Sequence, residues 1–262
     1  MREPSFSKML GLEFFSFLVL GMFQVPVLAA NPDFLWKVVS LECVPNQKNN
    51  NSPVPCVEVS FQKDGERGYA VFKDRNGPLQ YLLLPTTKIM GIEDPEVLTD
   101  KGPNYFYQAW EARSHLEKMY RSSIAPEEIS LTLNSLFGRS QNQLHIHISC
   151  TRPDVKTLIH TNLDQIGFVW SEFPKEIFGH KYFSRRITVQ QLKEENAFQL
   201  LAKDLPEAKA NMQAFGLAVV AIKNAMDKVE FVMLANRADL SKTDKGHVEE
   251  IQDHQCPQLF GK

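Results

Sequence analysis

Two histidines, His145 and His147, stand two positions apart in the segment 143–149, whose sequence is QLHIHIS. Apolar and polar residues alternate along this segment, and a period of two predicts a β-strand that is buried on one face. Both histidines then lie on the opposite face, together with Gln143 and Ser149. Residues two apart on a strand are separated by roughly 6–7 Å, so both imidazoles can reach one small anionic group.

A single histidine on a half-exposed strand would be interpreted as an ordinary surface residue. Here, however, the pair is flanked by Gln143 and Ser149 and preceded by the loop Gly138-Arg139-Ser140. Functional sites are sought where polar and titratable groups cluster in this way. We therefore predict that the pair has a chemical role.

A zinc or iron site is the first alternative, because a His-x-His pair on a strand can hold either metal. Such a site needs a third and usually a fourth ligand, fixed by further contacts. The next carboxylate along the chain is Asp154, beyond a Thr-Arg-Pro break, and the other histidines show no ligand spacing (His115, His160, His180, His247 and His254). The sequence therefore indicates no metal and no other cofactor.

The elements that must position the histidines can be predicted on both sides of them. Strands over 68–72 and 79–84 flank an Asn-Gly turn, and apolar residues at helical spacing predict an amphipathic helix over 104–120. A strand over 129–134 then leads, through 135–138, into the histidine strand. Beyond Pro153 we expect a helix opened by a capping box at Thr188 and Gln191, a second helix over 206–214, and a hairpin of 215–222 with 230–235.

The histidine segment resembles the histidine-triad signature, His-x-His-x-His, with Gln143 in the first place, His145 in the central one and His147 in the third. In that superfamily the central histidine attacks the α-phosphorus of a nucleotide, and water then releases the mononucleotide from a nucleotidyl-histidine intermediate. Imidazole suits this chemistry, because it is neutral and nucleophilic near pH 7. The alternative register makes His147 central and Ser149 third. We favour His145, because that register keeps Gly138 and Ser140 at the family distances.

The segments 42–47 and 252–256 are similar to one branch of that superfamily, the bacterial CDP-diacylglycerol pyrophosphatases. The resemblance implies hydrolysis of CDP-diacylglycerol, or a related nucleotide-lipid, to CMP and phosphatidate at a membrane surface. Three alternatives stay open. They are a weakly active or non-catalytic nucleotide or lipid binder, a hydrolase of another nucleoside diphosphate conjugate, and a metal-dependent barrel of cupin type.

The resemblance also implies roles for residues outside the histidine pair. Asp74, in Phe72-Lys73-Asp74, would take the ribose hydroxyls of the nucleotide. Asn134 and Ser140 would bind phosphate, and Arg139 would add a charge-assisted contact to a diphosphate. Gln143, where the family carries a histidine, can still donate a hydrogen bond through its amide.

Composition narrows the class of protein further. The chain has 262 residues, of which 43% are hydrophobic and 23% charged, which is typical of a globular protein. A formal net charge of −2 argues against general nucleic-acid binding, which needs a surplus of Lys and Arg. We therefore expect no nucleic-acid partner.

Residues 1–30 have the pattern of a targeting segment, with Arg2 and Lys8 before an apolar run that ends in Ala29 and Ala30. We expect either a cleaved signal peptide and a periplasmic protein, or an anchor at 10–30 that holds it at the periplasmic face of the inner membrane. Four cysteines fit an oxidising compartment. We predict that Cys43 pairs with Cys56 and that Cys150 pairs with Cys256.

The predicted fold class is α+β. We expect a histidine-triad-like antiparallel sheet with one packed helix, followed by a C-terminal α+β extension. In residue numbers, the targeting segment is 1–30 and the hydrolase domain is 31–262, with its core at about 66–153 and the extension at 154–262.

Overall fold

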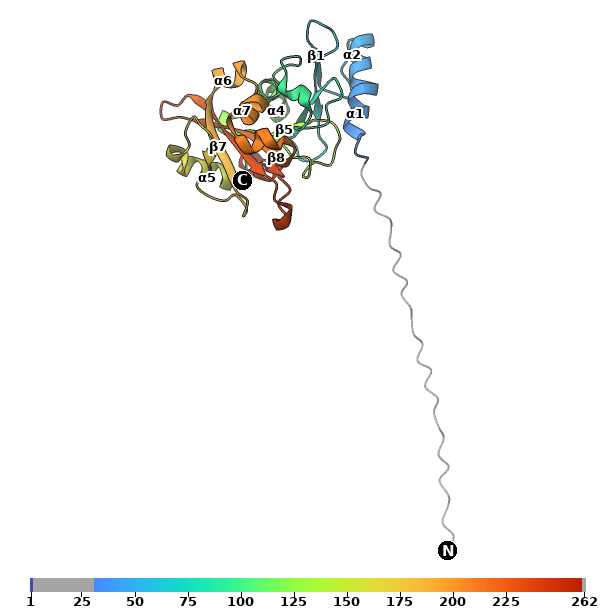
Figure 1. Cartoon of the computed structure of the whole chain (residues 1–262). Coiled ribbons are helices and arrows are strands. Elements are labelled where there is room, and N and C mark those ends of the chain that lie inside the picture. The colour runs from blue at the N-terminus through green and yellow to red at the C-terminus, as the bar shows by residue number, and fades with distance from the viewer. Residues whose placement is uncertain (2–30, 261–262) are drawn as a thin grey trace. The chain divides into compact units, whose positions relative to one another are not determined.

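The computed structural model describes Met1 and residues 31–260, so the predicted targeting segment lies outside the described residues. The described residues from 31 to 260 belong to one compact unit. Within the described part of the chain, no helix is long and apolar enough to cross a membrane. The fold class is α+β, as predicted, and its centre is a nine-stranded sheet in which every neighbouring pair is antiparallel (Figure 1).

The strand order across the sheet is β1-β2-β3-β5-β4-β8-β9-β7-β6. The strands are β1 (Glu58–Phe61), β2 (Gly68–Lys73), β3 (Tyr81–Pro85), β4 (Ile129–Leu133), β5 (Ile146–Cys150), β6 (Ser171–Glu172), β7 (Tyr182–Thr188), β8 (Phe215–Lys223) and β9 (Val229–Arg237). The α-helices are α1 (Phe34–Val38), α2 (Val44–Asn50), α3 (Tyr105–Ala112), α4 (Ser114–Tyr120), α5 (Pro153–Thr161), α6 (Val189–Glu194), α7 (Ala197–Asp204), α8 (Pro206–Ala210) and α9 (Pro257–Phe260).

Apart from β1, the strands follow the same pattern from each edge of the sheet to its middle. The order is β2-β3-β5-β4 from one edge and β6-β7-β9-β8 from the other. We call β2 to β5 the N-terminal half and β6 to β9 the C-terminal half. In each half a hairpin comes first, helices follow, and two further strands pair inward of the hairpin. The halves join where β4 pairs with β8, with Ser130 opposite Val220 and Leu133 opposite Leu217. The predicted C-terminal extension therefore continues the same sheet.

Helices from both halves cover one face of the sheet and share one hydrophobic core. Trp110 of α3 meets Phe231 of β9 edge to face, with ring centroids 4.8 Å apart, and Phe106 of α3 packs on Phe198 of α7 at 5.3 Å. The N-terminal half thus supplies a helix that lies on a strand of the C-terminal half. Such aromatic contacts across the halves favour their folding as one unit.

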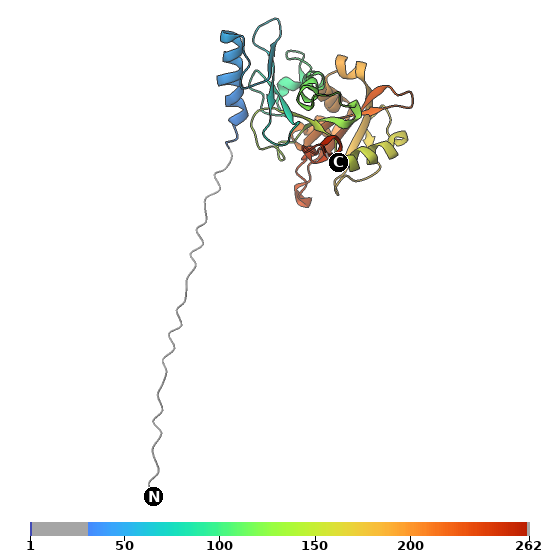
Figure 2. The same cartoon turned by 180° about the vertical axis from the view of Figure 1, so that it is seen from behind.

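The opposite face is covered at its two ends. The N-terminal rod that contains α1 and α2 packs over β2 and β3, through Val39, Leu82 and Leu84 (Figure 2). Helix α5 covers β8 and β9, through Val155 and Ile159. Between these two apolar clusters, β4 and β5 present polar side chains, and this strip holds the histidines.

Several predicted elements are confirmed, among them the Thr188–Gln191 capping box and the hairpin of β8 and β9. The helix expected over 104–120 is instead divided at Arg113 into α3 and α4. Residues 44–55 are polar and rich in Pro and Asn, a composition that predicts a loop, but the first part of this stretch is helix α2. Pro45 has no N–H for the carbonyl of Leu41, and the π-helical turn η1 (Val39–Cys43) that precedes it widens the helix there.

Both predicted cystines are confirmed, Cys43–Cys56 and Cys150–Cys256. The first joins the N-terminal rod to the segment that enters β1. The second joins the end of β5 to the C-terminal segment 247–256, which we call the strap. The strap contains the short helix η7 (Val248–Ile251) and is bridged to Thr151 at Gln252.

Candidate active site

His145 lies at the entry to β5, and its ring orientation is fixed by its own backbone. Its Nδ1 is 2.7 Å from the carbonyl oxygen of Gln143, which can only accept a hydrogen bond. Nδ1 must therefore carry the proton, and Nε2 keeps its lone pair. Burial of the ring lowers the pKa of His145, so the imidazole is neutral at pH 7. A neutral imidazole with an available Nε2 lone pair is a nucleophile.

His147 lies beside it on the same face, opposite Thr132 of β4 and Leu82 of β3. The centroids of the two imidazole rings are 5.0 Å apart. The Nδ1 atom of His147 is 2.8 Å from Gln80 Nε2, and its Nε2 is buried and has no hydrogen-bond partner within Met1 and residues 31–260. Only 6% of His147 is exposed, so the predicted half-exposed face was wrong: β5 is buried on both faces.

Glu249 of the strap makes polar contacts with several residues around the histidine pair. Its carboxylate accepts from His254 Nε2 at 2.8 Å and from Asn134 Nδ2 at 3.0 Å, and it lies 3.2 Å from His147 Nδ1. Burial acts to raise its pKa, but His147, His247 and His254 outweigh this effect and hold the pKa of Glu249 well below its usual range. The site therefore contains a buried anion beside the histidine pair.

Gln143 is buried, and its amide is already engaged. The Nε2 group donates to the carbonyl oxygens of Pro85 at 3.1 Å and Thr87 at 2.9 Å, while Oε1 has no partner in the part of the chain that the structure describes. The donation to substrate that the sequence suggested would require one of these bonds to break. In this conformation Gln143 offers an acceptor, and its two donated bonds tie the start of β5 to the segment after β3.

Asn134 and Arg139 are likewise engaged with other residues. Asn134 donates to Glu249 and accepts from the Glu249 backbone N–H at 3.1 Å, so it clamps the strap. Arg139 forms an ion pair with Glu93, at 2.6 and 2.7 Å to the two carboxylate oxygens. The resemblance placed both residues on the phosphate. The structure shows instead that each already has a protein partner.

Asp74 and Ser140 are less buried than the histidines, since Asp74 is half-buried and Ser140 is exposed. Asp74 accepts from the Asn76 N–H at 3.1 Å in the turn between β2 and β3. Its charge raises the pKa of His145 while that of Arg139 lowers it, although both effects are smaller than the effect of burial. Ser140 is exposed in the loop before β5. Asp74 and Arg139 therefore lie close enough to His145 to affect its pKa, and the roles of the predicted residues toward a substrate remain proposals.

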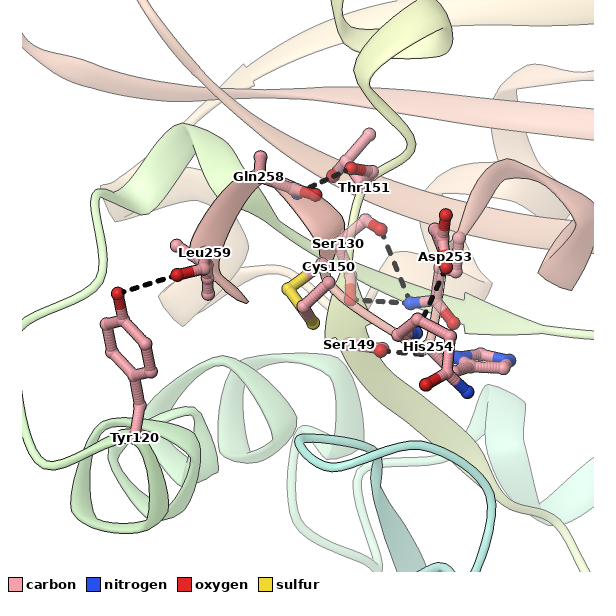
Figure 3. The surroundings of a disulfide bond; sticks show 12 residues. Tyr120, Ser130, Ser149, Cys150, Thr151, Asp253, His254, Gln258 and Leu259 are labelled. Carbon is pink, nitrogen blue, oxygen red and sulfur yellow. Dashed lines mark hydrogen bonds between the residues drawn. A yellow bond between two sulfur atoms is a disulfide. The ribbon is translucent and has the colours of Figure 1, made fainter. Parts of the chain in front are cut away.

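The strap is held on the polar strip by a set of bonds around the second cystine (Figure 3). The Asp253 N–H donates to the Cys150 carbonyl at 3.0 Å, and the Gln252 amide donates to the Ser130 carbonyl at 2.7 Å. Gln252 Oε1 accepts from the Thr132 hydroxyl at 3.0 Å. These contacts fix Glu249 and His254 over β4 and β5.

The sequence reasoning missed Glu249, Gln80 and Gln252, and it set His254 aside as scattered. The structure brings this acid and this histidine to the pair from about a hundred residues away. The sequence contained one indication that these residues belong to the site, because the segment 252–256 resembles the family. Among the described residues, no group of three or more His, Cys, Asp and Glu side chains has an arrangement that could hold a metal ion.

Comparison with known proteins gives two findings. A family model described as CDP-diacylglycerol pyrophosphatase matches residues 30–259. A curated Yersinia pestis protein named CDP-diacylglycerol pyrophosphatase is 44% identical to this chain over 230 residues, which covers 88% of this chain and 86% of that protein.

Proposed function

Because the chain belongs to the CDP-diacylglycerol pyrophosphatase family and is a hydrolase, we propose that it hydrolyses CDP-diacylglycerol through a nucleotidyl-histidine intermediate on His145. The observation that carries the mechanism is the bond from His145 Nδ1–H to the Gln143 carbonyl. This bond leaves the Nε2 lone pair as the reactive centre of a neutral, buried imidazole. The resemblance to the histidine-triad signature supports the same assignment.

In the first step, His145 Nε2 attacks the phosphorus that bears cytidine. The P–N bond forms as the bond between this phosphorus and the bridging oxygen breaks, and phosphatidate leaves with the electron pair. The proton of the resulting imidazolium stays on Nδ1, where it remains hydrogen-bonded to the Gln143 carbonyl oxygen. Phosphatidate is an acidic leaving group, so stabilisation of charge on the phosphate oxygens should matter more than proton donation.

In the second step, water attacks the same phosphorus. The new P–O bond forms as the P–N bond breaks, the lone pair returns to Nε2, and the water gives up one proton to solvent. The products are CMP and the regenerated neutral His145. No cofactor enters these steps, and the residues that act are on β5 and the segments around it.

The assay is CMP release from CDP-diacylglycerol in mixed micelles, compared with CDP-choline and an ADP-sugar under identical conditions. We expect turnover of the lipid substrate to exceed that of the other two. A quenched single turnover with label in the cytidine moiety should trap acid-labile, base-stable label on His145. No CMP release from the lipid would refute the activity, and label on His147 would refute the assignment of the nucleophile.

We also place the folded unit on the oxidising side of the membrane, against the lipid surface that holds its substrate. The two buried cystines support an oxidising compartment. Protease added to intact spheroplasts should then digest residues beyond 31. Digestion that occurs only after the inner membrane is breached would refute this location.

A further inference from the structure

The N-terminal rod carries apolar side chains on both of its sides, although the described part of the chain covers only one. On the inner side, Leu35 and Val39 are buried in the cluster that covers β2 and β3. On the outer side, Phe34 is 50% exposed and Leu41 is 70% exposed. A helix that is apolar all round is typical of a fully buried environment. The outer side of the rod is therefore apolar surface that a partner outside this chain can cover.

The exposed residues of the rod follow a helical spacing. Phe34, Lys37 and Leu41 are three and four positions apart, so they lie on one side of the helix, and all three are exposed. We call these three residues the rod face. Two apolar side chains with a lysine between them suit a membrane interface, where the apolar groups enter the acyl boundary and the ammonium reaches anionic headgroups.

The segment at which the rod begins is bonded to the loop that leads into the histidine strand. The Asn142 N–H donates to the Pro32 carbonyl at 2.6 Å. The Gln141 side chain accepts from the Leu35 N–H at 3.1 Å and donates to the Asn31 carbonyl at 3.0 Å. Whatever holds the rod face in place therefore also holds this loop.

The same loop carries groups that the proposed reaction uses. Ser140, which we assign to phosphate, directly precedes Gln141, and Gln143 directly follows Asn142. The Gln143 carbonyl is the acceptor that orients His145. The rod face is thus connected to the nucleophile through a short series of bonds. This connection fits a substrate whose diphosphate is cleaved while its acyl chains stay in the bilayer.

We propose that the rod face is the surface by which the protein lies on the lipid bilayer that contains its substrate, and that this contact brings the loop 138–142 to the lipid headgroups. The inference deepens the proposed function and rests on it. The sequence favours a bilayer as the partner, because the apolar run 10–30 ends directly before Asn31. A segment that enters a membrane there delivers the rod to the membrane surface.

A second exposed apolar pair provides a matched comparison. Phe168 is 50% exposed and Val169 is 74% exposed, almost the same as Phe34 and Leu41. This pair belongs to the C-terminal half, where the Arg186 N–H donates to the carbonyl of the preceding glycine and the Arg186 guanidinium lies 5.2 Å from the Phe168 ring. Its contacts are with β7 and not with the loop 138–142. We therefore assign the bilayer to the rod face and use the second pair as a control.

The first test measures contact with lipid and needs no turnover. All four cysteines of the chain are paired in cystines, so one introduced thiol can carry a nitrobenzoxadiazole fluorophore. Lys37→Cys places the label within the rod face. Lys118→Cys is the control, because this exposed lysine of α4 lies on the other face of the sheet. Each full-length protein is mixed with vesicles of phosphatidylethanolamine and phosphatidylglycerol that contain nitroxide-labelled phosphatidylcholine.

We expect the nitroxide lipid to reduce the emission of the label at position 37 by about twofold or more, because an interfacial side chain lies at the depth of the headgroup and acyl boundary. The emission at position 118 should stay the same. No quenching at position 37, or equal quenching at both positions, would overturn the inference. If the wild-type protein releases no CMP, the proposed function is refuted, and the quenching still decides the lipid contact.

The second test compares a bilayer substrate with a soluble one. For Phe34→Ser with Leu41→Ser, we expect kcat/KM on long-chain CDP-diacylglycerol in vesicles to fall about tenfold, because apolar area is withdrawn from the bilayer. With short-chain CDP-diacylglycerol dissolved as monomers, kcat/KM should stay within about twofold of wild type. Phe168→Ser with Val169→Ser should leave both values unchanged. Equal losses on the two substrates, or the same loss in the control, would overturn the inference.

Discussion

The two halves of the sheet share one strand order and one helix-covered face, but their opposite faces differ in chemistry. In the C-terminal half, β8 and β9 present Ala218, Val220 and Leu234, which are fully packed under α5. In the N-terminal half, β4 and β5 present Thr132 and His147 on the same face of the sheet, and these polar side chains are also buried. One arrangement of strands thus supports an apolar core in one half and a polar strip in the other.

The difference shows what a buried polar strip requires. Each buried polar group costs free energy unless it is hydrogen-bonded, so the N-terminal half needs partners that the C-terminal half does not. The strap supplies them through Glu249 and Gln252. Two of the buried polar atoms that have no hydrogen-bond partner among the described residues, His147 Nε2 and Gln143 Oε1, belong to this strip and to the start of its central strand. Buried polar atoms without hydrogen-bond partners are expected at functional sites.

The largest effect should come from the nucleophile. His145→Ala removes the Nε2 lone pair, so CMP release should fall by more than about 10⁴-fold while the fold is retained. The matched control is His180→Ala, which removes a histidine bonded to Glu250 at the surface of the C-terminal half. A His145→Ala protein that keeps activity would overturn both the mechanism and the division of roles between the halves.

His147→Ala should have the second largest effect. It removes the supporting group beside the phosphate but leaves the nucleophile, so kcat should fall by about 10²–10⁴-fold with measurable turnover left. Single-turnover quenching should still trap label on His145. Loss of activity as complete as that of His145→Ala, together with no trapped label, would contradict the supporting role.

Removal of each cystine in turn should show which one affects stability alone and which one also affects activity. On chain-entropy grounds, Cys150→Ala with Cys256→Ala should cost roughly 4.7 kcal/mol, and Cys43→Ala with Cys56→Ala roughly 3 kcal/mol. Only the first pair should also lower kcat, because Cys256 fastens the strap that carries Glu249. Denaturant unfolding and CMP release measure the two effects. Equal kcat in both variants would show that the strap needs no covalent fastening.

A leucine-to-alanine substitution in the core of each half tests the same difference between the halves. Leu234→Ala in β9 should destabilise the protein by about 2–5 kcal/mol without changing kcat per folded molecule. Leu82→Ala removes the same side chain from β3, but Leu82 lies opposite His147. It should lower both stability and kcat. A loss of kcat with Leu234→Ala in folded protein would assign the C-terminal half a role beyond support.

The smallest expected effect concerns pH. Burial lowers the pKa of His145 below the ordinary value of 6.5, and only the neutral imidazole attacks. The active form therefore persists below pH 6.5 and is lost only as the pH falls through the lowered pKa. The acid limb of kcat/KM, which reports on the free enzyme, should have its midpoint below pH 6.5. A midpoint at or above 6.5 would show that the ring is better solvated than the structure indicates.

Much of the architecture could be predicted from neighbouring residues alone. Alternation predicted the histidine strand, and the Thr188 capping box and the β8–β9 hairpin follow from local patterns. These features are predictable because a period, a cap or a turn depends on residues within a few positions of each other. Both disulfide pairings were also predicted, although four cysteines allow three pairings and 106 positions separate Cys150 from Cys256.

The sequence by itself determined the two histidines, their common face and the chemistry that imidazole offers. Only the tertiary structure decided which partner each ring receives. Glu249 reaches Gln80 across 169 positions of the chain, and Gln252 reaches Thr132 across 120. No local pattern encodes such contacts, because they exist only once the C-terminal half has extended the sheet and Cys256 has returned the strap to β5. The contact of His147 with Glu249, and with it the difference between the surroundings of the two histidines, depends on that return.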